Sequence, residues 1–317
     1  MKQIAFIIGL ILLSFTTYCQ QTDTLFHKLD SLSAKTDSAG GQKNNTNPKA
    51  YNERTALSPS TYVTLLASNL KQSFTKPFHM TRRDWGRLGK YAVVAGALAF
   101  ADEPVQQRAL EFRKDNPKFL STSNFITNFG GMYEGYVLGS FGAYGFIFHN
   151  EKMKTTTLLA TQAYITGAAI QTVVKLIGGR TRPSYYNPNI EAEPSFLGPF
   201  SDAGGLKNSS SFPSGHTTLA FAAATVFAME YKNKPWVPIL AYSSASIIGL
   251  SRITENKHWA TDVFVAAALG YLTGRQVVNN YHRYAKLKTP KQKKNSVSLN
   301  LQYNNGVVMP GLVYKFR

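Results

Sequence analysis

Cysteine and acidic residues are both scarce in this chain. Its one cysteine, Cys19, lies within the first twenty of 317 residues, so cleavage after it leaves a mature chain without cysteine. Such a chain needs no disulfide and tolerates an oxidising cell envelope. Only 17 Asp and Glu oppose 35 Lys and Arg, for a formal net charge of +18. This excess favours anionic partners such as phosphate esters or anionic lipid headgroups.

Other absences narrow the class of protein further. The Lys and Arg residues are scattered between apolar segments and form no nucleic-acid-binding motif, which argues against a nucleic-acid partner. Hydrophobic residues make up 44% and the mean hydropathy is −0.19, less apolar than is usual for six full-length membrane spans. The three blocks described below contain no Asp/Glu cluster with metal-ligand spacing, so we expect neither a metal nor a cofactor.

Four regions follow one another along the chain. Residues 1–20 resemble a secretory signal, with Lys2 before an apolar run from Ile4 to Leu13; a lipoprotein site at Cys19 and an uncleaved anchor helix are the alternatives. Residues 21–80 are interpreted as a disordered polar linker to residue 60, followed by a mildly amphipathic segment that lies on a membrane surface or against the core. Residues 81–285 form the main domain, and 286–317 a basic tail.

The main domain is predicted to be all-α. Apolar stretches of helical length and composition recur at 91–101, 134–148, 156–177, 217–229, 236–250 and 260–273. Pro104 suits the first position of a further, surface-facing helix at 104–115. We therefore expect a bundle of six to seven helices. In the tail, period-two alternation, a turn at 304–306 and a second run predict a short β-hairpin, with Pro310 and Gly311 restricting the second strand to an edge.

The most informative of three polar blocks is Ser251-Arg252-x5-His258-x3-Asp262. On a helix, residues four apart lie one turn apart on the same face. The carboxylate of Asp262 can then accept a hydrogen bond from one imidazole nitrogen and leave the other basic, as suits a nucleophilic histidine. Alone, the pair also fits an ordinary helix start. Arg252, six residues before His258, favours catalysis.

A second block, Pro213-Ser214-Gly215-His216, is expected to be a loop that enters a helix. Ser214 can cap that helix, and Gly215 lets the backbone approach an oxyanion closely. The Ser214 hydroxyl and the Gly215 N–H can both donate to a phosphate at the positive helix end. His216 then faces the leaving oxygen as a general acid. Alone, this block fits a capped helix with a surface histidine better.

The first block, Lys175-x6-Arg182-Pro183, follows an apolar helix. Pro183 forces Arg182 towards an extended backbone, which separates its guanidinium from the helix. Arginine can clamp phosphate oxygens with two hydrogen bonds, and lysine acts as a point charge. Such cations stabilise the transition state of phosphoryl transfer in place of a metal, each donor by roughly 3–4 kcal/mol. Alone, they fit solubilising charges, the role we assign to Arg180.

The three blocks together resemble the signature of the type 2 phosphatidic acid phosphatase superfamily, which also includes bacterial non-specific acid phosphatases and vanadium haloperoxidases. The likeness covers residues 85–285, and its specific evidence lies in 175–262, where every signature position is filled. The resemblance implies a helical bundle in which His258 forms a phosphohistidine, Asp262 assists it and His216 protonates the leaving group. It also implies a phosphate cradle made of Lys175, Arg182, Ser214, Gly215 and Arg252.

The leading hypothesis is thus a metal-independent phosphatase acting on phosphate monoesters or pyrophosphates, with lipid phosphates favoured. The alternatives are a vanadate-dependent haloperoxidase, a soluble non-specific periplasmic acid phosphatase and a non-enzymatic envelope protein that binds phosphorylated headgroups. The chain lacks the long extra helical region expected of the haloperoxidase, and the intact His258 and Asp262 argue against the non-enzymatic protein. We expect loop 184–212 to select the substrate, through Tyr185, Tyr186, Phe196 and Phe200.

The placement of the blocks bears on localisation. They fall at four helix ends that lie on one side of an up-down bundle, while Lys152, Lys154 and the basic tail fall on the other, which is typical of a positive-inside pattern. Against spanning, stretch 236–250 is about 22 Å long as a helix, short of the ~30 Å hydrocarbon core. We expect a membrane-associated enzyme of a bacterial-type cell envelope with its active site towards the periplasm, or a soluble periplasmic one. The oligomeric state stays open.

Overall fold

The computed structural model describes residues 25–29, 31, 51, 54–184, 193–199, 210–288, 296–304 and 307–315. The proposed signal peptide and most of the proposed linker lie outside these residues. The described chain is mainly helical, as predicted. Its α-helices from residue 59 onwards are α3 (Pro59–Thr75), α4 (Arg82–Ala99), α5 (Asp102–Asp115), α6 (Pro117–Thr127), α7 (Met132–Ile147), α8 (Glu151–Gly178), α9 (Gly215–Glu230), α10 (Trp236–Thr254) and α11 (Ala260–Lys288).

The predicted number of helices was too low. Between residues 81 and 285 the described chain forms eight α-helices, and α6 is the one that the apolar stretches did not predict. Helix α4 also begins earlier than expected. Thr81 and Asp84 form a capping box there, in which each side chain accepts from the backbone N–H of the other. This pairing satisfies free amides of the first turn and starts the helix in a polar sequence.

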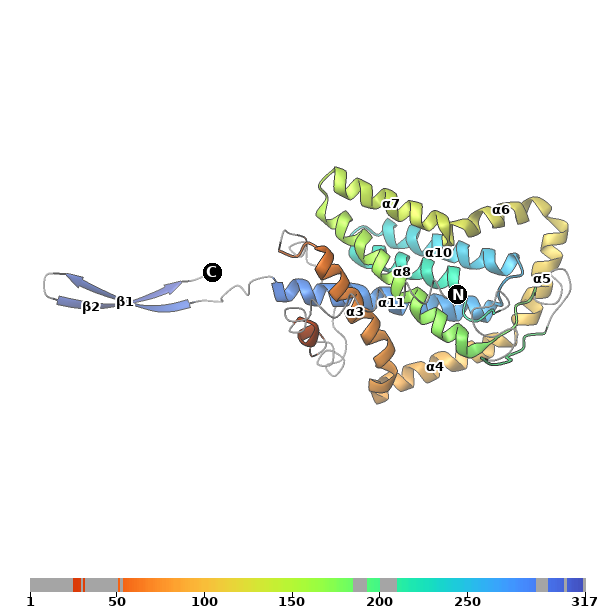
Figure 1. Cartoon of the computed structure of the whole chain (residues 1–317), viewed down its shortest axis with the longest axis horizontal. Helices are drawn as coiled ribbons and strands as arrows, with labels where there is room; N and C mark the ends of the chain where they lie inside the picture. The colour runs from red at the N-terminus through yellow and green to blue at the C-terminus, as the bar shows by residue number, and fades with distance from the viewer. Residues whose placement is uncertain are drawn as a thin grey trace, which may run out of the picture.

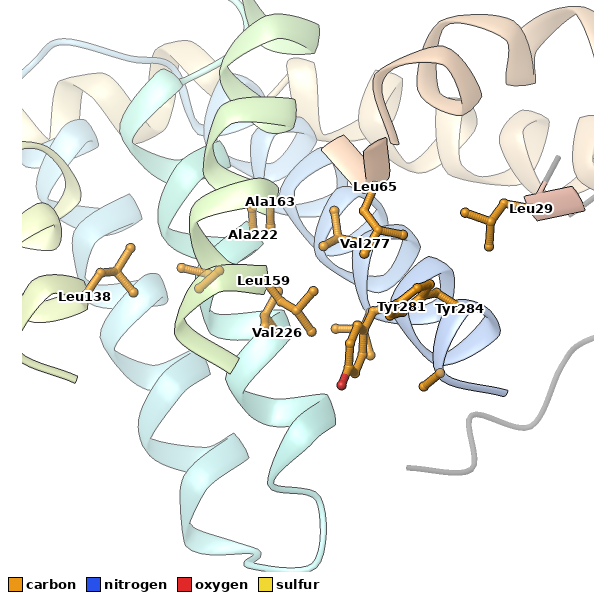
Figure 2. Close-up of a cluster of buried hydrophobic side chains, with 14 residues drawn as sticks. Leu29, Leu65, Leu138, Leu159, Ala163, Ala222, Val226, Val277, Tyr281 and Tyr284 are labelled. Atoms are coloured by element: carbon orange, nitrogen blue, oxygen red, sulfur yellow. The ribbon is translucent and has the colours of Figure 1, made fainter. Parts of the chain in front are cut away.

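Helix α9 packs against α8, α10 and α11. Its contact with α11 is close because Gly270 and Gly274 of α11 face it without side chains. A Cβ at Gly270 would lie 2.3 Å from the carbonyl oxygen of Thr218, and one at Gly274 would lie 2.5 Å from that of Ala222. Figure 2 shows the buried core that α9 shares with α8 and α11, and Ala222 of α9 belongs to it. Small residues thus bring the helices that carry the polar blocks close together.

Two segments expected to be peripheral are partly buried. In the proposed disordered linker, Leu29 is fully buried in a helical segment and Tyr51 donates a hydrogen bond to Glu230 of α9, so the expectation of disorder was wrong for these residues. Of the two placements expected for the amphipathic segment, α3 takes the one against the core, because Leu65 is 1% exposed and packs in the main hydrophobic cluster.

Helix α5 was predicted to be a surface helix. The prediction was wrong for one side of the helix, which is buried. The helix begins at Asp102, so Pro104 lies in its first turn. Asp102, Gln106 and Ala109 are buried, although Glu103 and other polar residues of the helix are exposed. Figure 1 shows α5 at the end of the bundle opposite the C-terminal strands, where α10 ends and α11 begins.

The C-terminal part is longer and more regular than the sequence suggested. Helix α11 continues to Lys288, well beyond the expected end at residue 273, and buries Tyr281 and Tyr284. The predicted hairpin is present as β1 (Ser296–Asn304) and β2 (Val307–Lys315), antiparallel, with Leu301 opposite Pro310. In Figure 1 these two strands lie away from the helices.

Candidate active site

The structure brings the three polar blocks together at one end of the helical bundle. Each block lies where a helix begins or ends, and the backbone N–H of Ser214 lies 3.4 Å from the carbonyl oxygen of Asp262, which links the second block to the third. The predicted residues are distributed over the last turn of α8 (Lys175), the segment after it (Arg182), the start of α9 (Ser214, Gly215, His216), the last turn of α10 (Arg252), the following loop (His258) and the first turn of α11 (Asp262).

His258 does not lie on the same helix as Asp262. Helix α11 begins at Ala260, so His258 belongs to the preceding loop, where its N–H donates to the carbonyl oxygen of Arg252 at 3.3 Å. Its Nδ1 lies 3.7 Å from Oδ2 of Asp262, which exceeds the distance of a normal hydrogen bond. The hydroxyl of Ser211 is 3.5 Å from the same nitrogen. Both contacts are on the Nδ1 side, so Nε2 remains for other chemistry.

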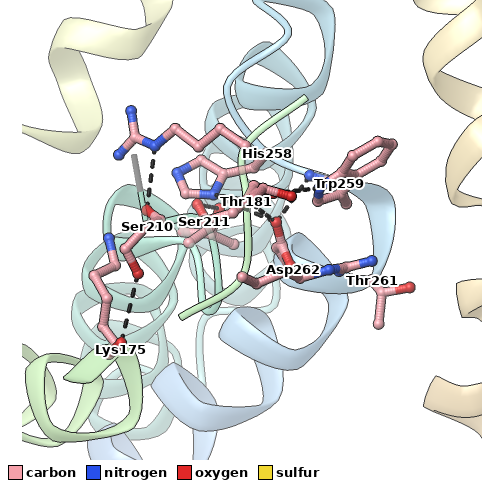
Figure 3. A network of polar contacts seen from close by, with 12 residues as sticks. Lys175, Thr181, Ser210, Ser211, His258, Trp259, Thr261 and Asp262 are labelled. Carbon is pink, nitrogen blue, oxygen red and sulfur yellow. Dashed lines mark hydrogen bonds and ion pairs between the residues drawn. The ribbon is translucent and has the colours of Figure 1, made fainter. Parts of the chain in front are cut away.

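The carboxylate of Asp262 is fully buried and surrounded by donors. Its Oδ1 accepts from Arg180 at 2.6 Å, and its Oδ2 accepts from the hydroxyl of Ser211 and, at 2.9 Å, from the N–H of Trp259 (Figure 3). Burial alone would raise the pKa of Asp262, but contact with His258 and the charge of Arg180 hold it below its ordinary value. Asp262 is therefore an anion whose position is fixed by several hydrogen bonds.

Arg180 was interpreted as a solubilising charge, and this was wrong. It is 2% exposed, and its guanidinium bridges Asp262 and Asp102, with a 2.6 Å contact to each. The guanidinium carbon also lies 5.0 Å from the ring centroid of Phe196 and 5.4 Å from that of Trp259. No local pattern indicates this ion pair, because Asp102 precedes Arg180 by many residues and belongs to a helix expected at the surface.

The cations of the three blocks act on one another and on both histidines. Burial, and then the charge of Arg182, lower the pKa of Lys175 to about 8. Burial, followed by the charges of Arg252, Lys175 and Arg182, lowers the pKa of His216 to about 4. The pKa of His258 falls to about 3, mainly through burial, although Asp262 opposes the fall. Both imidazoles are therefore neutral near pH 7 and lie in a strongly positive environment.

Hydrogen bonds hold two of these cations in place. The Nε of Arg182 donates to the carbonyl oxygen of Ser210 at 3.2 Å. Figure 3 shows the side chain of Lys175 running beside Ser210. The guanidinium of Arg252 donates from Nη1 to Glu255 at 2.8 Å and to Thr127 of α6 at 3.2 Å. Sequence reasoning missed both partners; the spacing of Arg252 and Glu255 fits a helical pair, whereas Thr127 lies on a helix that was not predicted.

The second block forms the start of α9 but differs in detail from the prediction. Ser214 occupies the N-cap position without a capping hydrogen bond from its side chain, because its hydroxyl pairs with that of Thr217 at 2.8 Å. The imidazole of His216 lies against the backbone of Gly130 and Gly131, where a Cβ at Gly131 would come within 3.3 Å of Nε2. These glycines leave the space that the ring occupies.

Part of the expected substrate-selecting loop can be placed. Tyr185, Tyr186 and Phe200 lie outside the described residues, whereas Phe196 packs on Arg180. Beside it, a mostly apolar hollow of about 310 Å³ opens between α4 and α11, lined by Tyr91, Ala92, Ala95, Gly96, Ala99, Arg180, Phe196, Phe212, Thr261 and Val265. In the described part of the chain, no group of three or more His, Cys, Asp or Glu side chains is arranged to hold a metal ion.

Comparison with known proteins finds similarity to one family and to three phosphatases. The model of the PAP2 superfamily matches residues 156–286. A lipid A 1-phosphatase of Porphyromonas gingivalis is 52% identical over 65 residues, which are 20% of this chain and 15% of that protein, so the chain spans a small part of this curated relative. A PAP2-type phosphatidylglycerolphosphate phosphatase from Bacillus subtilis aligns with 23% identity over 65% of this chain and 96% of its own, with a TM-score of 0.47. LpxE of Aquifex aeolicus aligns with 26% identity over 51% and 87%, with a TM-score of 0.37.

Proposed function

Residues 156–286 belong to the PAP2 superfamily, and on this premise we propose that the protein is a phosphatase that hydrolyses phosphate monoesters or pyrophosphates of lipids. The observation that carries the proposal is the convergence of Lys175, Arg182 and Arg252 on two neutral histidines, of which His258 is buried and His216 is partly buried. Cations that act on one another across a shared space are costly to bury without an anion, and a phosphate supplies that anion.

In the first step, Nε2 of His258 attacks phosphorus and the bond from phosphorus to the leaving oxygen breaks. Nδ1 faces Asp262, whose negative charge stabilises the positive charge that develops on the ring. His216 gives a proton to the leaving oxygen. Binding of the phosphate offsets the nearby cations, which raises the pKa of His216 and lets it hold that proton. The cations, the Ser214 hydroxyl and the Gly215 N–H stabilise the equatorial oxygens.

In the second step, water attacks the phosphohistidine. His216, now neutral, accepts a proton from the water, the bond from phosphorus to Nε2 breaks, and inorganic phosphate leaves. The cycle returns His258 to its neutral form, which is the form favoured by its lowered pKa. When inorganic phosphate leaves, the pKa of His216 falls again and its proton passes to solvent, so both histidines return to the neutral form of the free enzyme.

Four observations support a lipid substrate and association with a membrane. An apolar hollow lies beside the site, and the relative that matches over 65 residues is named for a lipid phosphate. Large apolar side chains are exposed on α4, α7 and α10, including Val93, Ile147 and Ile239. Helix α10, Trp236–Thr254, is the one described helix long and apolar enough to cross a membrane. We place the active site on the periplasmic side of a bacterial-type envelope.

The test uses the full chain in detergent with a soluble aryl phosphate. Wild-type protein should release phosphate with EDTA present, and vanadate should compete with substrate. After rapid denaturation at alkaline pH, where the phosphorus–nitrogen bond survives, labelled substrate should leave phosphohistidine. His258→Ala should remove both turnover and label, whereas His79→Ala, at an exposed histidine, should keep them.

Three results would contradict the proposal. Full activity of His258→Ala would show that His258 is not the nucleophile. Loss of activity in EDTA that a divalent ion restores would show that the reaction depends on a metal. Vanadate-dependent halide oxidation without phosphate release would identify a haloperoxidase instead.

A further inference from the structure

Helix α5 directs two buried polar side chains at the loop that carries His258. Asp102 and Gln106 are one helical turn apart, so they lie on the same face, and they are 1% and 4% exposed. Both precede the part of the chain that matches the superfamily model, and neither belongs to the three polar blocks. Their burial on an otherwise polar helix calls for partners, and these lie on both sides of His258.

Asp102 holds the C-terminal side of the loop. Its Oδ1 accepts from the N–H of Thr261 at 2.9 Å and from the hydroxyl of Thr261 at 3.0 Å. Its Oδ2 accepts from Arg180 at 2.6 Å, and the same guanidinium donates to Asp262 at 2.6 Å. Asp102 therefore fixes the first turn of α11 directly and acts on Asp262 through Arg180.

Gln106 holds the N-terminal side. Its Nε2 donates to Oδ1 of Asn256 at 3.1 Å, and Asn256 is 1% exposed. Asn256 has a φ of 58°, in the left-handed region, where the chain turns from the end of α10 towards His258. A side-chain hydrogen bond at this turn fixes the point from which the loop departs, two residues before the imidazole.

We propose that Asp102 and Gln106 are positioning residues for the nucleophile. Their hydrogen bonds hold the His258 loop on both of its sides, and Asp102 also orients Asp262 through Arg180. The inference rests on the proposed function, since it assumes that Nε2 of His258 attacks phosphorus. The hydrogen bonds described above connect α5 to the His258 loop, Arg180 and Thr261, and none of them involves Lys175, Arg182 or Ser214. Loosening α5 should therefore slow the chemical step more than it weakens phosphate binding.

Two variants and two matched controls test this in the full chain. Asp102→Asn keeps the shape of the side chain but removes the charge that pairs with Arg180. Gln106→Leu keeps much of the volume and removes one neutral hydrogen bond, so it is the milder test of folding. Glu103→Gln and Gln107→Leu make the same kinds of change at exposed positions of α5. Each variant is measured for kcat and KM on a soluble aryl phosphate, the inhibition constant of vanadate, the rate of phosphohistidine formation and thermal unfolding.

We expect kcat and the rate of phosphohistidine formation to fall about ten- to a hundredfold in both buried variants, because small displacements of a reacting group have effects of this size. KM and the vanadate constant should stay within about twofold, since ground-state binding is preserved. The controls should match wild type. A double variant with Arg180→Gln should be little worse than Arg180→Gln alone, because Asp102→Asn keeps an oxygen that can accept from Thr261 and so acts largely through Arg180.

The inference fails if both folded variants keep the wild-type kcat, or if KM and the vanadate constant rise in step with the loss of kcat. It also fails if Asp102→Asn and Arg180→Gln combine with fully additive losses. Absence of phosphatase activity in the wild-type protein would instead overturn the proposed function, so the two failures are distinct.

Discussion

At the scale of single residues, His216 has the most specific expected effect on substrate choice. A general acid is needed most when the leaving oxygen is a poor leaving group, as in an alkyl phosphate. We expect His216→Ala to lower kcat about 100-fold or more on alkyl phosphates and less than about tenfold on a nitrophenyl phosphate. Steady-state rates on both substrates measure this. Equal losses on both would show that His216 only binds phosphate.

Lys175 should set a limit on activity at high pH. Its pKa is lowered to about 8, so the free enzyme loses this cation as pH rises through that value and keeps it below. Because kcat/KM reports the free enzyme, it should fall above pH 8 as the cradle loses charge. Lys175→Arg carries a cation that stays protonated, so its high-pH decline should move upwards on the same substrate. An unchanged decline would assign it to another group.

The low-pH side of the same profile follows from the histidines. The pKa of His258 is lowered to about 3, so the nucleophile stays neutral down to that pH, and we expect no decline in kcat/KM near pH 6.5, where an ordinary imidazole becomes protonated. The kcat/KM profile measured for the Lys175 experiment also tests this expectation. A decline near pH 6.5 would contradict the lowered pKa of His258.

At the scale of elements, the sequence predicted α8, α9, α10 and α11 because each contains a long, continuous apolar stretch beside a polar block. It missed α6, which has no long apolar stretch: Ile126 packs against α10, and the buried Ser123 and Thr127 make polar contacts with the same helix. It likewise misplaced Arg180. A charge looks solvated in sequence, and its burial depends on Asp102, a partner on another helix that only the tertiary fold brings near.

Within the site, too, local patterns predict the residues, whereas their contacts depend on the tertiary fold. Local spacing pointed to His258 and Asp262, but their geometry depends on Ser211 and Trp259, which donate to Oδ2 of Asp262. These residues come from two different parts of the chain, so no single motif contains the arrangement. The roles of the eight predicted site residues stay predictions, to be decided by the variants proposed above.

Helix α4 offers a test of where a lipid chain lies. Gly96 lines the hollow beside Arg180, and a Cβ there would meet nothing within 4 Å, so a larger side chain can fill the space without a clash at its base. We expect Gly96→Leu to raise KM for a long-chain lipid phosphate about tenfold and to leave a soluble aryl phosphate unchanged. Gly89→Leu, on the same helix, also has open space and lies outside the hollow, so it is the matched control.

Equal KM values for Gly96→Leu and wild type on the lipid would show that the acyl chain does not use this hollow. A rise on both substrates would show that the substitution disturbs the phosphate site itself, because Arg180 lines the same hollow and contacts Asp262. The soluble substrate therefore separates an effect on the lipid tail from an effect on the chemistry.

At the scale of the whole molecule, more large apolar side chains are exposed than is usual for a water-soluble protein. Val93 on α4 is 73% exposed and Phe100, directly after α4, is 89% exposed, while Ile147 on α7 and Ile239 on α10 are 68% and 67% exposed. Many large, strongly exposed apolar side chains favour contact with a membrane or a partner. Several helices contribute these side chains, so a bilayer that surrounds the bundle covers them better than one protein partner does.

We therefore expect the full chain to sediment with membranes, to stay there through a high-salt and an alkaline carbonate wash, and to require detergent for release. Salt matters as a control because the net charge of +18 alone would bind anionic lipid, and that attraction weakens as salt rises. Release by salt would indicate a peripheral, electrostatic attachment. Recovery in the soluble periplasmic fraction without detergent would support the soluble acid phosphatase and leave the exposed apolar side chains to be covered by another protein.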